Sequence, residues 1–434
     1  MHIFITKIKQ IFNNTKGLRI VLSSLFCYSW SMKRRQAFKF RLEPSVADRI
    51  LFARFAGSCR LVWNKTLALQ KERLDRQEKI FSFSDSCKLL TDWKKELALS
   101  FLKDCHSQPL QQTLKALDRA LKDAFNKSDP KDFPRFKKRG KKDSFRYPQG
   151  FKVDEPNSRV YLPKIGWVRY RRSRQLIGTP KNITISKKGD NWFVSIQTER
   201  EVEAPIHSST SMVGGDLGIA RFLTLSTGEF FAPLNSFKVL EKQLARFQKT
   251  LARREKEANN RQKIKRKIAK LHIKIANARH DYLHKLSHYI SKNHAVVVLE
   301  DLKVANMSKS AKGTIDEPGT NVTAKSGLNK SILDQGWHEF KRQLTYKLEW
   351  LGGMLVLVNP KNTSRCCPEC GHTSGENRKT QSTFKCVECG YQNNADLVGA
   401  LNVLKRAGHA QIACGDIDLI RGLAQEPAQI TAFG

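Results

Sequence analysis

Two features are scarce in this sequence, and each scarcity excludes a class of protein. No apolar run reaches about 18 residues, the length that a membrane-spanning helix needs, so we expect no transmembrane helix. Acidic residues are also scarce: 40 Asp and Glu stand against 78 Lys and Arg, which gives a formal net charge of +38 at pH 7. Such an excess repels itself in a compact fold unless a polyanion neutralises it. We therefore expect binding to a phosphate backbone, with a steep dependence on salt, in preference to an anionic membrane surface.

The sequence also lacks the regular cysteines of a disulfide framework. Of its ten cysteines, five are scattered singly and five crowd between Cys366 and Cys389. Single thiols beside one tight cluster are typical of a protein in a reducing cytosol that carries a metal site. A length of 434 residues exceeds one ordinary domain and predicts two to four units.

Residues 1–31 differ from the rest of the chain. Two basic stretches precede the apolar run from Leu18 to Trp30, a pattern that resembles a signal peptide, but no small-residue cleavage site follows. We therefore expect a non-essential N-terminal extension and a working chain that begins at Met32. An export or membrane signal is the alternative.

Hydrophobic periodicity divides the remaining chain into strand-rich and helix-rich parts. Residues 37–42 (AFKFRL) alternate apolar and basic residues, as a strand does, and residues 46–128 carry apolar residues at helical spacing. Short β-type runs fill residues 151–200 and predict a small barrel. In the C-terminal half, strands alternate with helices, which predicts an α/β domain with a basic helical hairpin at 236–292 and a mobile loop at 303–334.

Residues 131–147 interleave cationic residues with four aromatic ones. Cations that hold phosphates beside rings that stack on bases are typical of contacts with single strands and RNA. The alternative is a solvated basic loop whose aromatic residues anchor it to the core. We favour nucleic-acid contact and assign it to Arg135, Lys137, Lys138, Arg139, Lys141, Lys142, Arg146 and Tyr147.

Two CxxC pairs form the most specific local motif. Cys367 and Cys370 make the first pair, and Cys386 and Cys389 make the second. A glycine follows each pair and permits a tight backbone turn around a metal. Four thiolates complete a closed tetrahedral shell, so we expect one structural Zn²⁺ per chain. Cys366 is the alternative ligand in the first pair, although only Cys367 has the two-residue spacing to Cys370.

Three acidic residues stand at positions where carboxylates could converge. Asp216 lies in the expected strand MVGGD, Glu300 ends the apolar strand AVVVLE, and Asp396 starts a helix after the second CxxC pair. Carboxylates from neighbouring strands and a nearby helix can bind two divalent ions about 4 Å apart. Simpler interpretations exist, because Asp301 is a rival to Glu300 and Asp396 could be only the N-cap of its helix.

A series of motifs, in a fixed order, resembles one known family. From Met32 onward the chain resembles TnpB, also called OrfB, a protein encoded by many bacterial insertion sequences. The motifs that carry the resemblance are AFKFRL, CRLVWN, PRFKKRG, GGDLGIARFLTLSTG, VVLEDL, TSRCCPECG, KCVECG and DLVGALN.

The resemblance implies an α+β multidomain fold. Its parts are an RNase H-like RuvC nuclease domain interrupted by a zinc ribbon, a small wedge β-barrel and a helical recognition domain. The implied bounds are 32–45 for the first wedge strand, 46–130 for the recognition domain, 131–205 for the basic loop and remaining wedge, 206–360 for the nuclease domain, 361–392 for the zinc ribbon, 393–410 for the last nuclease helix and 411–434 for a tail.

The resemblance also implies an enzyme, a metal-dependent DNA endonuclease. A guide RNA from the transposon would select double-stranded target DNA beside a short flanking motif. Asp216, Glu300 and Asp396 would be its catalytic residues and would bind two Mg²⁺. Such a protein would work in the bacterial cytoplasm, at the nucleoid, without a membrane partner. Two positions depart from the family pattern: Gly215 stands where Ile or Val is usual, and Val398-Gly399 replace Asn-Ala.

Two other functions fit parts of the sequence. A non-catalytic DNA-binding regulator of transposition would keep the zinc ribbon for architecture. A strand-transfer transposase would have to use the same three carboxylates, because the sequence has no HUH motif or tyrosine nucleophile context. The three acidic residues favour the endonuclease, since carboxylates beside a polyanion are costly unless a cation bridges them.

Overall fold

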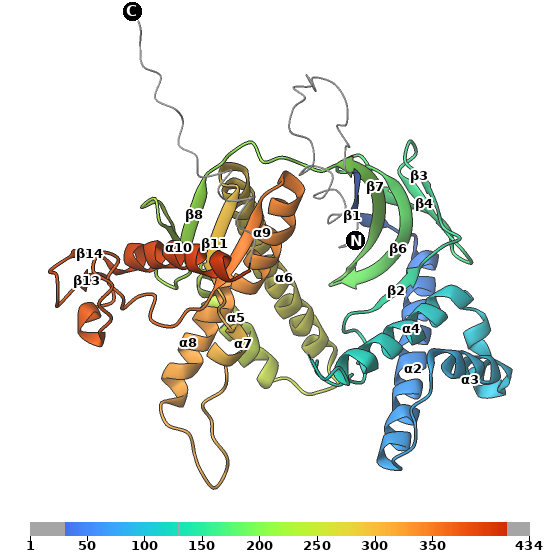
Figure 1. The fold of residues 1–434 in the computed structure, drawn as a ribbon. Helices are drawn as coiled ribbons and strands as arrows, with labels where there is room; N and C mark the ends of the chain where they lie inside the picture. The colour runs from blue at the N-terminus through green and yellow to red at the C-terminus, as the bar shows by residue number, and fades with distance from the viewer. Residues whose placement is uncertain (1–30, 129–130, 415–434) are drawn as a thin grey trace, which may run out of the picture.

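The computed structural model describes residues 31–128 and 131–414, with the side chains of its last helix as far as Gly408. It is a mixed α+β fold with two larger β-sheets and one small one (Figure 1). The expected N-terminal extension falls almost wholly in residues 1–30, outside the described part. No helix of the described residues is long and apolar enough to cross a membrane.

Helices make up most of residues 46–124, as the periodicity predicts. Two of them begin with a capping box, in which a serine and an aspartate three residues later exchange hydrogen bonds with each other's backbone: Ser45 with Asp48, and Ser82 with Asp85. The elements are α2 (Val46–Asp75), α3 (Phe83–Lys95), the 3-10 segment η1 (Leu97–Lys103) and α4 (Ser107–Ala124).

A seven-stranded antiparallel sheet packs against these helices. Its order is β2-β6-β7-β1-β5-β4-β3. The central strand β1 extends beyond the predicted residues 37–42 at both ends. The strands are β1 (Ser31–Glu43), β2 (Ser144–Tyr147), β3 (Lys152–Asp154), β4 (Arg159–Leu162), β5 (Gly166–Arg171), β6 (Thr179–Lys188) and β7 (Asn191–Glu203).

Among the described residues the strand order of this sheet is open, so the expected small barrel is not closed there. β2 and β3 are its edges, and no ladder joins them among the described residues. The sheet curls over the helices instead (Figure 1), and one hydrophobic core runs through both layers. Phe52 and Phe55 of α2, for example, pack on Phe145 of β2.

A second, five-stranded sheet lies in the C-terminal half, in the order β10-β9-β8-β11-β12. β8, β11 and β12 are parallel, and β9 and β10 are antiparallel additions. All residues of β11 are buried, as expected for a strand with parallel neighbours on both sides. The bounds are β8 (Met212–Asp216), β9 (Leu223–Leu225), β10 (Phe230–Phe231), β11 (Val296–Glu300) and β12 (Met354–Val358).

Alternate residues of β11 face different helices. Val297 and Leu299 pack with α6 (Asn259–Asn293) and α9 (Trp337–Leu351). Val296 and Val298 instead pack with α10 (Ala395–Cys414). The sheet is therefore covered on both faces, and α10 covers the second face at this strand.

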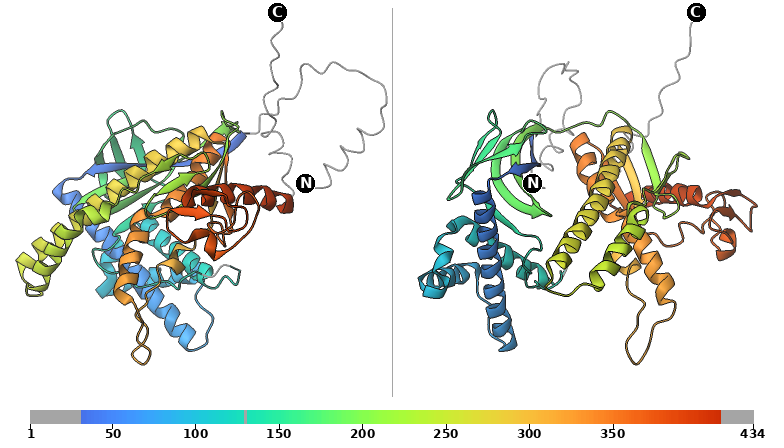
Figure 2. Two further views of the ribbon diagram at one scale, coloured as in Figure 1. Left: turned by 90° about the vertical axis from the view of Figure 1, so that its left-hand side faces the viewer. Right: turned by 180° about the vertical axis from the view of Figure 1, so that it is seen from behind.

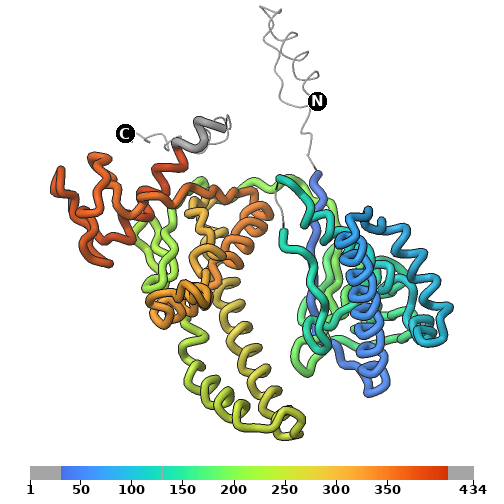
Figure 3. Tube along the Cα trace, turned by 90° about the horizontal axis from the view of Figure 1, so that it is seen from below, coloured from blue at the N-terminus to red at the C-terminus, as the bar shows by residue number. Residues whose placement is uncertain are grey.

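The helical hairpin and the loop region agree with the sequence only in part. α5 (Ser236–Ala252) and α6 form the predicted basic hairpin, which extends away from the five-stranded sheet (Figure 3). The prediction of a mobile loop at 303–334 is wrong, because α7 (Val304–Met307) and α8 (Val322–Gln335) form there. The carboxylate of the buried Asp334 accepts hydrogen bonds from Ser236 Oγ at 3.0 Å and Phe237 N at 2.9 Å. This tertiary contact outweighs the polar composition that favours a loop.

The part with the seven-stranded sheet contacts the part with the five-stranded sheet at α9 and at α6. In the first contact, Arg34 of β1 donates from Nη2 to the backbone oxygen of Trp350 in α9, at 2.8 Å. In the second contact, the β6–β7 hairpin meets α6, where Lys188 Nζ donates to Asn277 Oδ1 at 2.8 Å. Further views show the two sheets apart, with α6 between them (Figure 2).

α10 approaches β8 so closely that residue 214 has no room for a side chain. A Cβ atom at Gly214 would lie 2.4 Å from the backbone oxygen of Ala400 and 2.8 Å from the backbone nitrogen of Leu404. Both atoms belong to the helix backbone and cannot move by a rotamer change. Glycine at this position therefore sets the distance between helix and sheet.

Replacing Gly214 should loosen this contact. Gly214→Ala is expected to destabilise the fold by about 2–3 kcal/mol, because α10 has to shift off β8. Gly408→Ala on the same helix is the matched control: its Cβ would meet nothing within 4 Å, so we expect no loss of stability. Thermal unfolding measures both, and an unchanged midpoint for Gly214→Ala would contradict this packing.

Candidate functional site

Strand alternation brings two of the predicted acidic residues to the face that α10 covers. Glu300 follows Val296 and Val298 at two-residue spacing and so points to that face. Asp216 has the same spacing from Gly214, which α10 contacts. β8 and β11 are parallel, with Gly215 opposite Leu299, so both carboxylates stand at the same ends of neighbouring strands.

Asp396 reaches the same place from the first turn of α10. The N-cap function belongs to Asn394, whose side-chain oxygen accepts from the backbone N–H groups of Asp396 at 3.1 Å and Leu397 at 3.4 Å. The simpler interpretation of Asp396 as a cap is therefore wrong. Its carboxylate instead pairs with Arg378 Nη2 at 3.6 Å.

The charges of Glu300 and Asp396 both act on the carboxylate of Asp216. Burial, followed by the negative charges of Glu300 and Asp396, raises the pKa of Asp216 to about 7. Burial also raises the pKa of Glu300, whose residue is 6% exposed.

Asp301, the rival of Glu300, is set apart from this group. Its carboxylate forms ion pairs with Lys303 at 2.6 Å and Lys341 at 3.6 Å. The hydrogen bond from Lys303 lowers the pKa of Asp301, in contrast to the raised pKa of Glu300. The two neighbours therefore have different surroundings, and Glu300 is the one that faces Asp216.

A chain of buried polar residues holds Glu300. Thr363 Oγ1 donates to Glu300 Oε1 at 2.5 Å. Asn402 of α10 donates from Nδ2 to the backbone oxygens of Thr363 at 2.8 Å and Cys366 at 2.7 Å. Sequence reasoning did not assign a function to Thr363, Asn402 or Arg378. The first two lie in the motifs TSRCC and GALN, but a motif does not reveal which side chains meet in space.

Both departures from the family pattern have local explanations. A Cβ atom at residue 399 would lie 2.9 Å from Asp216 Oδ2, so Gly399 leaves room for that carboxylate. A Cβ atom at residue 215 would lie 2.7 Å from Leu223 Cδ1 and 2.8 Å from Leu299 Cδ2. Two leucines thus occupy the space that the usual Ile or Val would need.

The four predicted cysteine ligands form a compact cluster. Their Sγ atoms all lie within 4.8 Å of one another, and the Cys367–Cys389 and Cys370–Cys386 pairs are each 3.6 Å apart. Sulfurs bound tetrahedrally to zinc at about 2.3 Å would be about 3.8 Å apart, so the cluster could hold a metal ion such as zinc. Cys366 lies outside it, and its Sγ contacts backbone oxygens instead.

The cluster belongs to a small module between β12 and α10. Gly371 and Gly390 follow the two CxxC pairs with φ of 77° each, which is the left-handed turn that glycine permits. The backbone N–H of Cys389 lowers the pKa of the Cys386 thiol to about 6, which favours the thiolate. The module contains the 3-10 segment η2 (Gly375–Arg378) and the strands β13 (Thr383–Lys385) and β14 (Gln392–Asn394).

The basic segment 131–147 is partly a docked loop and partly a strand. Asn64 of α2 accepts from the backbone N–H of Lys137 at 2.8 Å and donates to its oxygen at 3.0 Å. All seven assigned cationic residues are exposed. The assignment of Tyr147 to nucleic-acid contact is wrong, because its side chain is fully buried. Phe145 and Tyr147 point into the core from β2, and only Arg146 points outward between them.

Three family models match this chain. They are described as "Probable transposase" for residues 195–311, "Cas12f1-like, TNB domain" for residues 337–403 and "Helix-turn-helix domain" for residues 32–79. The last segment folds here into one strand and one helix, β1 and α2, and so contains no helix-turn-helix.

Related proteins match nearly the whole chain. "Putative RNA-guided DNA endonuclease InsQ" of Escherichia coli (strain K12) is 54% identical over 400 residues, which cover 92% of this chain and 99% of that protein. A "Putative RNA-guided DNA endonuclease" of Streptomyces pristinaespiralis is 32% identical over 387 residues, covering 88% and 91%. The chain therefore belongs to the TnpB/OrfB family, and the resemblance of its motifs is confirmed.

Similarity to solved structures is more remote. The "Structure of the mini-RNA-guided endonuclease CRISPR-Cas_phi3" covers 86% of this chain and 92% of that chain, with 13% sequence identity and a TM-score of 0.45. At that level the likeness adds nothing to the family assignment.

The cysteine cluster predicts one zinc ion per chain. Cys386→Ser is expected to lower both the zinc content and the thermal unfolding midpoint, because the binding energy of a structural zinc contributes directly to folding. Cys366→Ser is the matched control, since it removes a neighbouring thiol outside the cluster. Elemental analysis and thermal unfolding test this. A full zinc complement in a Cys370→Ser/Cys389→Ser double variant would refute the site.

Proposed function

We propose that this protein is an RNA-guided DNA endonuclease encoded by a transposable element, with Asp216, Glu300 and Asp396 as its catalytic residues. The observation that carries the proposal is the meeting of these three carboxylates, from β8, β11 and α10, under α10. Buried like charges are costly without a compensating cation. A chain with a net charge of +38 has no general need for such a group, so a specific use explains it best.

The donor set suits divalent metal ions. Carboxylate oxygens are ligands that Mg²⁺ prefers. A bound cation would favour the charged form of Asp216, whose pKa is raised by burial and then by the charges of Glu300 and Asp396. Two Mg²⁺ bound there would activate a water molecule and stabilise the leaving oxygen of a phosphodiester.

The chain's own residues orient these ligands. Thr363 holds one oxygen of Glu300, and Asn402 fixes the segment that carries Thr363. Arg378 holds Asp396 from the side of the cysteine module. The zinc of that module would be structural, because four thiolates leave no coordination position for a substrate.

The strand order supports an RNase H-like nuclease domain, as the family resemblance implies. β8, β9 and β10 form an antiparallel meander, and β11 and β12 add in parallel on the other side of β8. The proposed catalytic carboxylates of Asp216 and Glu300 stand at the C-terminal ends of the neighbouring strands β8 and β11.

Charge and relatives support an RNA guide and a DNA target. The two long relatives both carry the name of an RNA-guided DNA endonuclease. Pairing with a transposon-derived guide RNA would select double-stranded DNA beside a short flanking motif. The exposed cations of the segment 131–146 would hold nucleic-acid backbone, and their contribution to affinity would fall with added salt.

A non-catalytic DNA-binding regulator is the alternative function. Such a protein needs the basic surface and the cysteine module, but it does not need an oriented, buried Glu300. The hydrogen bond from the buried Thr363 therefore favours the enzyme.

Neutralising a site carboxylate should abolish cleavage without unfolding the protein. The RNA that co-purifies with the chain is sequenced first, and its 3′ end defines the DNA target. Asp216→Asn and Glu300→Gln are then expected to lower Mg²⁺-dependent cleavage about 10²-fold or more, because each removes several kcal/mol of charge stabilisation. Asp301→Asn is the matched control and should cut at nearly the wild-type rate, since its carboxylate pairs with lysines.

Each outcome separates the alternatives. Unfolding midpoints close to wild type in all three variants distinguish lost chemistry from a lost fold. An Asp216→Asn protein that cuts at the wild-type rate would rule out the carboxylate assignment. Binding of duplex DNA without co-purifying RNA or cleavage would favour the regulator.

A further inference from the structure

Two arginines face each other across β1 and β7. Arg34 and Arg200 are direct cross-strand neighbours in the antiparallel ladder. Like charges in this position repel each other and destabilise a sheet. The next residue along β1 is compensated, because Arg35 lies opposite Glu199 and forms an ion pair with it at 2.8 Å.

Both arginines belong to the inner face of the seven-stranded sheet. Arg34 shares that face with Phe38 and Phe40, and Arg200 shares it with Ile196, by the two-residue alternation of strands. The two arginines lie on the core-facing side of the sheet, beyond the last buried apolar residues of β1 and β7 on that side. Both residues are half-buried, and the Nε atom of each is covered without a hydrogen-bond partner among the described residues.

Among the described residues, no carboxylate forms an ion pair with Arg34. Its hydrogen bond to Trp350 is to a neutral backbone oxygen. Burial, and then the charge of Arg200, lowers the pKa of Arg34, the direction expected for a cation without a counter-ion. Residues 1–30, which lead into β1, contain no Asp or Glu. The segment that precedes β1 therefore offers no side-chain carboxylate to this pair.

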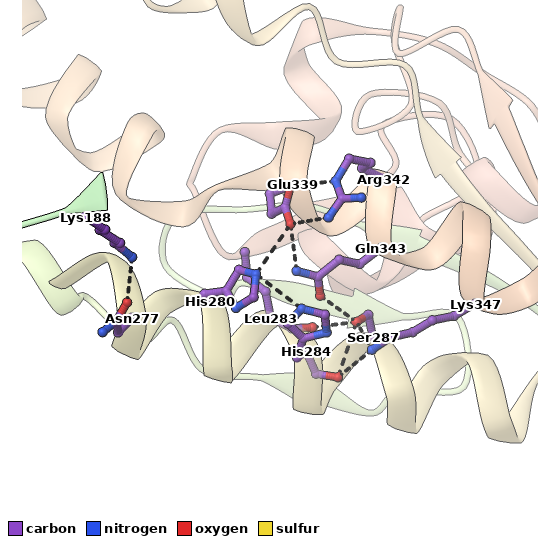
Figure 4. A network of polar contacts seen from close by, with 10 residues as sticks. All are labelled: Lys188, Asn277, His280, Leu283, His284, Ser287, Glu339, Arg342, Gln343 and Lys347. Carbon is purple, nitrogen blue, oxygen red and sulfur yellow. Dashed lines mark hydrogen bonds and ion pairs between the residues drawn. The ribbon is translucent and has the colours of Figure 1, made fainter. Parts of the chain in front are cut away.

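An aromatic ring supports the Arg34 guanidinium. Arg34 Cζ lies 5.5 Å from the ring centroid of Trp350, whose ring packs on Tyr346 at 4.9 Å. An arginine stacked on a ring keeps in-plane N–H donors available for an anion. Arg342 lies similarly over Tyr346, at 5.6 Å, but its donors already meet Glu339 at 2.7 and 2.8 Å (Figure 4).

We propose that Arg34 and Arg200 together bind one phosphodiester group of a nucleic acid where the seven-stranded sheet meets α9. This inference rests on the proposed function and deepens it by naming a backbone contact. Phosphate oxygens can accept from two guanidinium groups at once, which removes their repulsion. A nucleic acid suits the site better than a small anion, because a chain with a charge of +38 requires a polyanion. Guide RNA and target DNA share this chemistry.

The test measures binding by the full-length protein after a high-salt wash removes bound nucleic acid. Three labelled probes share one sequence of about 20 nucleotides: an RNA strand, its hybrid with DNA, and the DNA duplex. Arg34→Gln and Arg200→Gln are each expected to weaken binding about tenfold and to reduce the slope of log Kd against log salt by about 0.9. The double variant should lose no more than about twofold beyond either single variant, because both arginines hold one phosphate. The probe that responds identifies the RNA or the DNA as the source.

Two matched controls make the same change in net charge. Arg35→Gln and Arg342→Gln remove arginines that already pair with carboxylates, and each should bind within about twofold of wild type. Arg34→Gln should also raise the unfolding midpoint of the free protein, because it removes a repulsion, whereas Arg35→Gln should not. A folding defect therefore cannot imitate the expected loss of binding.

Two results would overturn the inference, and they differ in what else they overturn. Equal salt slopes for Arg34→Gln and Arg35→Gln, or unchanged binding in both variants of the pair, would overturn it and leave the proposed function intact. A wild-type protein that binds none of the three probes would overturn both.

Discussion

The direct contact of helix α10 with the backbone of β8 is the constraint on which the candidate site depends. Gly214 allows that contact, because any side chain there would meet the helix backbone. The close approach brings Asp396 to the end of β8, where Asp216 stands, and places Gly399 against its carboxylate. The same helix carries Asn402 to the segment that holds Glu300. One residue without a side chain thus positions groups from three distant parts of the sequence.

The cysteine module reaches two of the three carboxylates. Arg378 within it pairs with Asp396, and Thr363 at its entrance bonds to Glu300. Asn402 joins both ends of that entrance by donating to the backbone oxygens of Thr363 and Cys366. The module, Asp396 and Glu300 therefore belong to one polar network, although they come from separate motifs of the sequence.

Sequence patterns correctly predicted the features that depend on the spacing of residues close together in the chain. The cysteine cluster and the buried strand that ends at Glu300 follow from residues close together in the chain. Alternation in the segment SFRY also carried the signal that Tyr147 is buried, but the surrounding lysines and arginines favoured a loop. The helix α8 depends on a tertiary contact of Asp334, and the opposition of Arg34 and Arg200 depends on a strand register. No single-sequence pattern encodes either contact.

The four thiols lie in the segment between β12 and α10, so metal binding there would affect how stably α10 is held against the sheet. The segment 359–394 leaves the five-stranded sheet and returns to it, and closing a flexible loop of that length costs roughly 3 kcal/mol. A zinc ion held within the loop would offset that cost by mass action. Each tenfold rise in free zinc above the dissociation constant would then add about 1.4 kcal/mol to the stability of the folded state. The cell's zinc buffering would accordingly set how firmly α10 stays docked, and a zinc-starved cell would hold a population in which Asp396 has left its partners.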